Sequence, residues 1–99
     1  RSIFVVISEI NKEELLSDFV NKLPEIRKKL GLSQSELGDK VGLSRQSISS
    51  IERGTVTLSW NIFLAIVLVV FVNDPEIFED IADDERYLAV IESLKTNWI

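Results

Sequence analysis

Apolar residues recur at helical spacing over the first clearly patterned stretch of the chain. Asn11 followed by Glu14 is typical of a helix N-cap with an acid in the first turn, so a helix is expected to begin near Lys12. Pro24 interrupts the pattern, and a proline inside a helix removes one backbone hydrogen bond. The sequence therefore allows either one bent helix to Leu30 or two helices that meet near Asn21. The apolar positions are Leu15, Leu16, Phe19, Val20, Leu23, Ile26 and Leu30.

Residues 32–55 contain two shorter helical patterns joined by a tight turn. Ser33 and Glu36 have the Ser-x-x-Glu spacing of a capping box, which predicts a helix beginning at Gln34. Gly42 can adopt the left-handed conformation that ends a helix, and Ser44 can cap the next one. Two short helices at this spacing predict a helix-turn-helix.

The second of these helices has one apolar and one polar face. At 3.6 residues per turn, Ile48 and Ile51 fall close together and are expected to be buried. Arginine, glutamine and serine side chains can bond base edges in a major groove and the phosphates beside it. The polar face consists of Arg45, Gln46, Ser49, Ser50 and Arg53.

The run GLSQSELGDKVGLSRQSISSIERG, residues 31–54, resembles the Cro and phage-repressor type of helix-turn-helix, also called the xenobiotic-response-element family. The resemblance covers about residues 19–72. It implies an all-α, lambda-repressor-like helix-turn-helix bundle of five to six helices, with a short extended arm at the N-terminus. It also implies a DNA-binding regulator of transcription whose recognition helix, Arg45 to Glu52, enters the major groove.

The resemblance also implies roles for individual residues. The family's base-reading positions fall on Arg45, Gln46 and Ser50, and Ser49 shares their face. Gln34 matches a glutamine that touches a phosphate and often supports the side chain at position 46. Gly38 is a departure, because alanine is usual there. It keeps the small volume that lets a neighbouring backbone come close, but we expect it to weaken the helix by about 1 kcal/mol relative to alanine. The expected phosphate-binding residues are Gln34, Ser47, Arg53 and Thr55.

Residues 60–72, WNIFLAIVLVVFV, are apolar on nearly every side. A membrane span needs about 20 apolar residues, so this shorter run favours a buried core helix. An amphipathic helix needs only one apolar stripe. We therefore expect the second side to be covered either by the C-terminal region or by the same helix of a second subunit.

Two further helical patterns follow. Asp74 and Pro75 form a cap and a first helical position, and Ile77, Phe78 and Ile81 give that helix its apolar face. A last helix is expected after Asp83 and Asp84. Its apolar positions are Tyr87, Val90, Ile91, Leu94 and Trp98.

The N-terminal run IFVVI, residues 3–7, is expected to be a strand or the first turn of an arm packed on its own domain or on a partner. The chain begins with Arg1 and contains no methionine, so we expect a trimmed or partial product. We interpret residues 1–99 as a single DNA-binding domain with three parts. These are an arm and helix over 1–20, a Cro/repressor-like core over 21–72, and an acidic helical extension over 73–99 that serves dimerisation.

Composition and charge narrow the function. The 99 residues include no Cys and no His, which excludes zinc fingers, thiol chemistry and imidazole bases. A net charge of −5 argues against a nucleic-acid partner, yet residues 22–57 carry seven basic and four acidic residues, a local charge of +3. The acidic charge is concentrated in the C-terminal part, where we interpret it as helix-start charge and solubilising surface. This acidic cluster consists of Glu79, Asp80, Asp83, Asp84 and Glu85.

Two functions from different classes remain open. The first is a cytoplasmic, sequence-specific regulator that binds double-stranded DNA, acting as a repressor and as a homodimer on an inverted repeat through residues 60–72 and the C-terminal helix. The second is an antitoxin or interaction module that masks a basic protein partner and whose DNA binding is autoregulatory. We expect no enzymatic activity and no catalytic residue, because no nucleophile is found paired with a general base. We also expect no cofactor, no metal and no membrane association.

Overall fold

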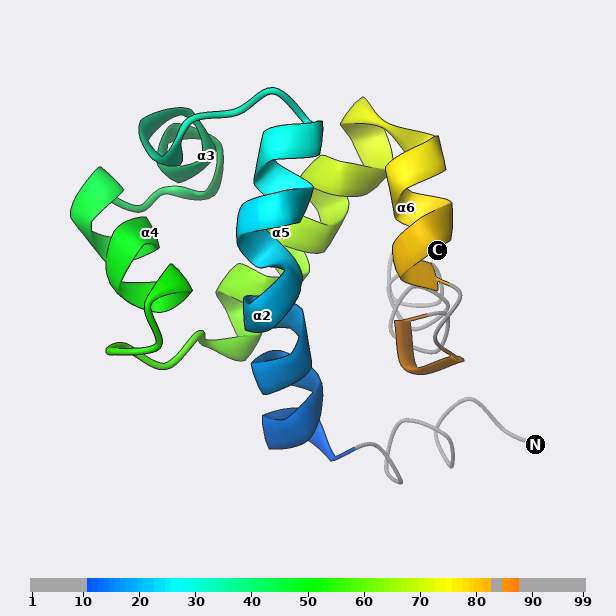
Figure 1. Cartoon of the computed structure of the whole chain (residues 1–99), viewed down its shortest axis with the longest axis horizontal. Coiled ribbons are helices and arrows are strands. Elements are labelled where there is room, and N and C mark those ends of the chain that lie inside the picture. The colour runs from blue at the N-terminus through cyan, green and yellow to red at the C-terminus, as the bar shows by residue number, and fades with distance from the viewer. Residues whose placement is uncertain (1–10, 83–84, 88–99) are drawn as a thin grey trace.

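The computed structural model describes residues 11–82 and 85–87, and this part of the chain is helical without β-strands (Figure 1). The all-α prediction is confirmed. Residues 1–10, 83–84 and 88–99, and with them the predicted arm and most of the predicted last helix, lie outside the described residues. The helices are α2 (Lys12–Lys29), α3 (Gln34–Val41), α4 (Arg45–Glu52), α5 (Trp60–Asn73) and α6 (Pro75–Ala82), and residues 85–87 form a further helical turn.

Helix α2 runs without interruption through Pro24. The side chain of Asn11 caps it by accepting a hydrogen bond from the Glu14 backbone N–H at 3.1 Å, as predicted. The alternative of two helices meeting near Asn21 is wrong. Proline removes only one backbone bond, and the buried Leu23 and Ile26 hold the helix to the core on both sides of it.

Helices α3 and α4 begin and end where their capping residues predict. Ser33 and Glu36 form both halves of the capping box, with distances of 3.0 Å. Gly42 ends α3 in the left-handed region at φ 78°, ψ 28°. The Ser44 hydroxyl accepts from the Ser47 N–H at 3.1 Å and caps α4. The predicted helix-turn-helix is confirmed.

One hydrophobic core joins the helices. Phe19 of α2 meets Phe63 of α5 edge to face, with ring centroids 5.0 Å apart and planes at 86°. Tyr87 is fully buried, and its ring lies 6.2 Å from Phe19 and 6.1 Å from Phe63. The other buried apolar residues are Leu15, Leu23, Ile26, Leu37, Ile48, Ile51, Leu58, Ile66, Val67, Val70 and Ile77.

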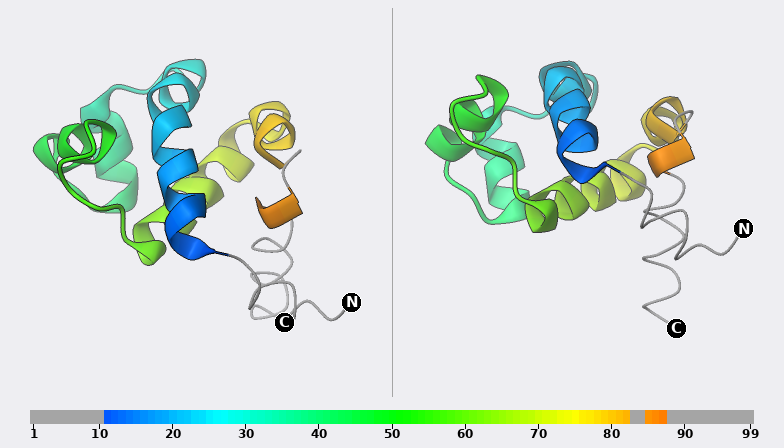
Figure 2. Two further views of the ribbon diagram at one scale, coloured as in Figure 1. Left: turned by 60° about the horizontal axis from the view of Figure 1, so that its bottom comes forward. Right: turned by 90° about the horizontal axis from the view of Figure 1, so that it is seen from below.

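Helix α5 buries one side and exposes the other. Its inner residues, which include Ile66 and Val70, are fully buried, whereas Leu68, Phe71 and Val72 are 48%, 45% and 69% exposed. In the right-hand view of Figure 2, α5 lies along one edge of the described part of the molecule, with α2 on its inner side. Within the described residues, no helix is long and apolar enough to span a membrane.

Helix α6 starts at the predicted cap. A carboxylate oxygen of Asp74 accepts from the N–H groups of Glu76 and Ile77 at 3.0 and 3.2 Å. Ile77 is buried as expected. The side chains of Phe78 and Ile81, and residues Val90, Ile91, Leu94 and Trp98, lie outside what the structure describes.

Candidate nucleic-acid interface

Helix α4 presents a polar face away from the core. Ile48 and Ile51 are 0% and 4% exposed and fasten the helix to the bundle. Arg45 and Gln46 are exposed in the first turn. The half-buried Ser49 and Ser50 follow on the same side. The four residues predicted to read bases are therefore brought together on one helix.

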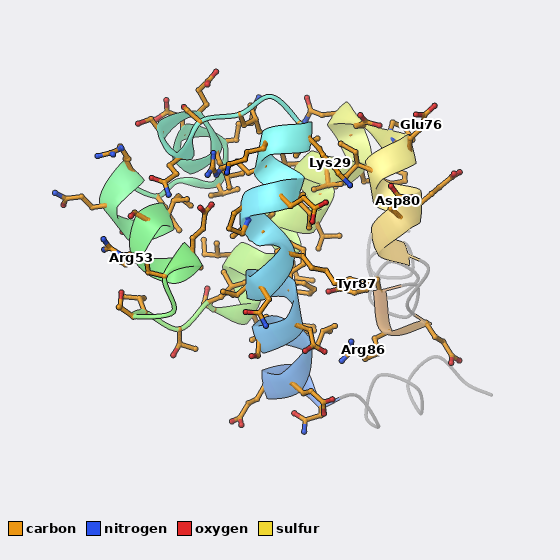
Figure 3. All side chains as sticks on the ribbon, viewed as in Figure 1. Lys29, Arg53, Glu76, Asp80, Arg86 and Tyr87 are labelled. Carbon is orange, nitrogen blue, oxygen red and sulfur yellow. The ribbon has the colours of Figure 1, made fainter. Side chains whose placement is uncertain are left out.

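The residues after α4 fold back onto its last turn. The Thr55 hydroxyl and backbone N–H both donate to the Ser50 carbonyl, at 3.1 and 3.0 Å. Arg53 is exposed and donates to the Ser50 hydroxyl at 3.5 Å. Figure 3 shows Arg53 on the outer side of α4, away from α5. Arg53 and Thr55, both predicted to bind phosphate, thus border the face of α4 at its C-terminal end.

Ser47 lies in the first turn of α4. Its hydroxyl accepts a hydrogen bond from the hydroxyl of the capping residue, Ser44, at 3.0 Å. The residue is half-buried at the N-terminus of the helix. Backbone N–H groups at such a terminus favour an anion, which is compatible with the predicted phosphate contact.

Glu52, the last residue of α4, receives three side-chain hydrogen bonds. Arg27 of α2 donates to its two carboxylate oxygens at 2.8 and 3.2 Å, and Gln34 of α3 donates to it at 3.1 Å. A further guanidinium N–H of Arg27 donates to the Leu32 carbonyl at 2.9 Å. The hydrogen bond to Glu52 is the main reason that the pKa of Arg27 is raised above its ordinary value. These contacts hold α4 to both α2 and α3.

This network gives Gln34 and Arg27 a partner that the sequence did not predict. Gln34 matches a family glutamine that often supports the side chain at position 46, and in this structure its amide donates to Glu52. The side chain of Arg27 is only 11% exposed and is directed to Glu52. The sequence feature that could have indicated these contacts is Glu52. A carboxylate without a cationic partner, on a helix expected to face phosphates, would be repelled by them.

The comparisons with known proteins agree with this geometry. Residues 25–66 match a family model described as Helix-turn-helix. This stretch is thus similar to helix-turn-helix domains, as its Cro/repressor-like motif led us to expect. Families of this type are non-enzymatic DNA-binding families.

One relative of this helix-turn-helix domain is an uncharacterized HTH-type transcriptional regulator, YgzD, of Bacillus subtilis (strain 168). It is 47% identical over 34 residues, which are 34% of this chain and 52% of the relative. The chain therefore spans about half the length of that relative. No solved structure matches the chain.

The turn of the helix-turn-helix depends on a close approach at Gly38. A Cβ atom at this position would overlap the backbone carbonyl oxygen of Leu43. The Leu43 N–H also donates to the Gly38 carbonyl at 2.9 Å. This contact agrees with the expectation that Gly38 lets a neighbouring backbone come close, since the missing Cβ lets the turn pack against α3.

Lys29 and the carboxylates of α6 lie away from the face of α4 in Figure 3. Lys29 pairs with Glu25 at 3.3 Å, with both side chains at least half exposed, and points away from α4 in Figure 3. Glu79, Asp80 and Glu85 are exposed, whereas Asp83 and Asp84 lie outside the described residues. Within the described residues, no group of three or more His, Cys, Asp or Glu side chains is arranged to hold a metal ion.

Proposed function

We propose that this protein binds double-stranded DNA in a sequence-dependent way and regulates transcription. The observation that carries the proposal is the polar face of α4, which is exposed opposite the buried Ile48 and Ile51 and is fixed to two other helices through Glu52. The helix-turn-helix match and the name of the Bacillus subtilis relative support the same reading. In this arrangement, α3 crosses the backbone and α4 enters the major groove.

The proposed base-reading and phosphate-binding roles follow from the positions of the side chains. Arg45 favours guanine and Gln46 favours adenine or guanine, because both side chains can form paired hydrogen bonds to base edges. Ser49 and Ser50 offer shorter hydroxyl contacts from the same face. Contacts to phosphate fix the register without reading sequence. The proposed phosphate-binding residues are Gln34, Ser47, Arg53 and Thr55.

Gln34 can still take the phosphate role while it holds Glu52. A side-chain amide nitrogen carries two N–H groups, and one of them is used by the 3.1 Å bond to Glu52. Its backbone N–H lies in the first turn of α3, where the helix dipole favours an anion. In this proposal, Gln34 therefore connects the phosphate backbone of DNA to Glu52 at the C-terminal end of α4.

A direct test is selection of bound duplexes from a random pool, with competition by unselected DNA at two ionic strengths. The proposal predicts enrichment of a defined site whose advantage over unselected DNA persists when the salt concentration is raised. Non-specific binding depends on counterion release and falls steeply with salt. Enrichment of no sequence, or binding that salt removes equally from all duplexes, would contradict sequence-dependent recognition.

We further propose that the protein acts as a repressor, as a homodimer on an inverted repeat. A single unit of this size buries little surface on DNA, so two units on half-sites about one helical turn apart are expected. The exposed Leu68 and Val72 support a dimer surface on α5. Because no residue from Trp60 to Asn73 is charged, two copies of this helix can pack together without opposing like charges. The C-terminal helix proposed to complete the surface lies outside the described residues.

A second function is favoured by the segregation of charge. Residues 58–99 carry eight acidic and two basic residues, and α6 presents exposed carboxylates at the end of the molecule opposite Arg53 (Figure 3). Such a surface suits an antitoxin or interaction module that masks a basic protein, with autoregulatory DNA binding. Light scattering separates the two functions. A stable dimer without a partner favours the regulator, and a monomer that becomes compact only with a partner favours the module.

A further inference from the structure

Residues 85–87 fasten onto α2 through two different contacts. The guanidinium of Arg86 pairs with the Asp18 carboxylate at 3.0 Å, and these side chains are 28% and 43% exposed. The ring of Tyr87 is fully buried beside Phe19 and Phe63. Figure 3 shows both side chains directed from the turn at 85–87 toward α2. A segment near the end of the chain thus completes the packing of the first described helix.

The same helix α2 carries Arg27, which holds the recognition helix. Arg27 lies nine positions after Asp18, a separation of about 13 Å along a continuous helix. Leu23 and Ile26, between the two contact points, are buried in the core. One helix therefore connects the contact with residues 85–87 to the contact with Glu52.

We propose that residues 85–87 act as a positioning strap that sets the orientation of the recognition helix through α2. The inference rests on the proposed function, because its consequence is measured as DNA recognition. Tyr87 and Arg86 touch no DNA in this account. They are positioning residues that act through Arg27 and Glu52.

The paired contact between Arg27 and Glu52 suits this role. A planar guanidinium that bonds both oxygens of a carboxylate fixes direction as well as distance. Base-reading side chains must be held to within about 0.5 Å of their productive geometry. A small shift of α2 that reaches Arg27 is therefore passed to α4, and with it to Gln46 and Ser50.

The test measures affinity for the selected duplex in two backgrounds. Asp18→Lys opposes Arg86 with a like charge and leaves the core intact, whereas Tyr87→Leu removes the aromatic ring. In the native background, each change is expected to weaken specific binding by about 3- to 10-fold. In a background carrying Arg27→Met and Glu52→Leu, where the connection is already cut, the same changes are expected to alter affinity by less than about 2-fold.

Two controls separate positioning from loss of folding. The double variant Asp18→Lys with Arg86→Glu restores an ion pair of opposite polarity and is expected to recover native affinity. Tyr87→Phe keeps the ring and is expected to bind like the native protein. All affinities are measured at a temperature well below the thermal unfolding midpoint of each variant. Equal loss of affinity in both backgrounds, failure of the charge swap to restore binding, or unchanged affinity in the native background would overturn the positioning role. Failure of the proposed function is a different result, since the unaltered protein would then prefer no duplex.

Discussion

Arg27 and Glu52 are 25 positions apart in the chain, yet the guanidinium of the first donates two hydrogen bonds to the carboxylate of the second. The two side chains are 11% and 7% exposed, so the pair is largely withdrawn from water. Attraction between opposite charges is stronger there than at an open surface, and so is the cost of leaving either charge alone. The pair therefore fixes α4, and the loss of one partner alone is expected to be costly.

Removing one member of this pair is expected to be costly. Glu52→Ala leaves a nearly buried guanidinium without its carboxylate, and we expect it to lower the free energy of unfolding by about 2 to 3 kcal/mol. Replacing both residues, with Arg27→Met and Glu52→Leu, should recover most of that loss because no unpaired charge remains. Urea unfolding of the single and double variants measures this. A double variant less stable than Glu52→Ala would contradict the account.

The capping box of α3 is expected to respond to acid. The backbone N–H and hydroxyl of Ser33 lower the pKa of Glu36 below its ordinary value. A lowered folded-state pKa contributes stability above the unfolded-state value of about 4.3, and this contribution is lost as the pH falls through the folded-state pKa. The difference in unfolding free energy between the native protein and Glu36→Gln should therefore shrink as the pH falls below about 4. A difference that stays constant from neutral to acid pH would show that the carboxylate has no such role.

Gly38→Ala tests the close approach in the turn. Alanine favours a helix over glycine by about 1 kcal/mol, but its Cβ would meet the Leu43 carbonyl oxygen. Overpacking of this kind costs about 1 to 3 kcal/mol, so we expect a net loss of stability. Thermal unfolding measures the effect. Ser35→Ala is a matched control, because Ser35 is exposed on the same helix. A variant at position 38 more stable than the native protein would show that the turn opens freely.

The features that could be predicted from the sequence are those that depend on residues three or four positions apart. The caps at Ser33 and Ser44, the left-handed Gly42 and the buried pair Ile48 and Ile51 follow from local hydrogen bonds and helical periodicity. The partners of Arg27 and Gln34 could not be predicted in the same way, because the crossing of α2, α3 and α4 decides which side chains meet.

Two other features also depended on tertiary structure. Packing of Leu23 and Ile26 carried α2 through Pro24, although proline is unfavourable inside a helix. A close backbone approach at Gly38 was expected, but sequence spacing does not identify the Leu43 carbonyl oxygen as the atom that a Cβ would meet.

The proposed dimer depends on the outward side of α5. Leu68→Glu places a charge among exposed apolar residues and should shift the protein from dimer to monomer without unfolding it, since Leu68 is 48% exposed. Ile66 is unsuitable for this test, because it is fully buried and a charge there would disrupt the core. Sedimentation velocity with circular dichroism measures both effects. Glu76→Gln on α6 is the control, and a Leu68→Glu protein that remains dimeric would remove this face from the interface.

The central claim is that the polar face of α4 reads bases, and Gln46→Ala tests it most directly. Affinities of the native protein and the variant are measured for the selected duplex and for every single-base change in it. The account predicts a loss of about 1 to 3 kcal/mol on the selected site and relaxed preference at one base position, with the other positions unchanged. An equal loss on all duplexes, with every base preference retained, would contradict it.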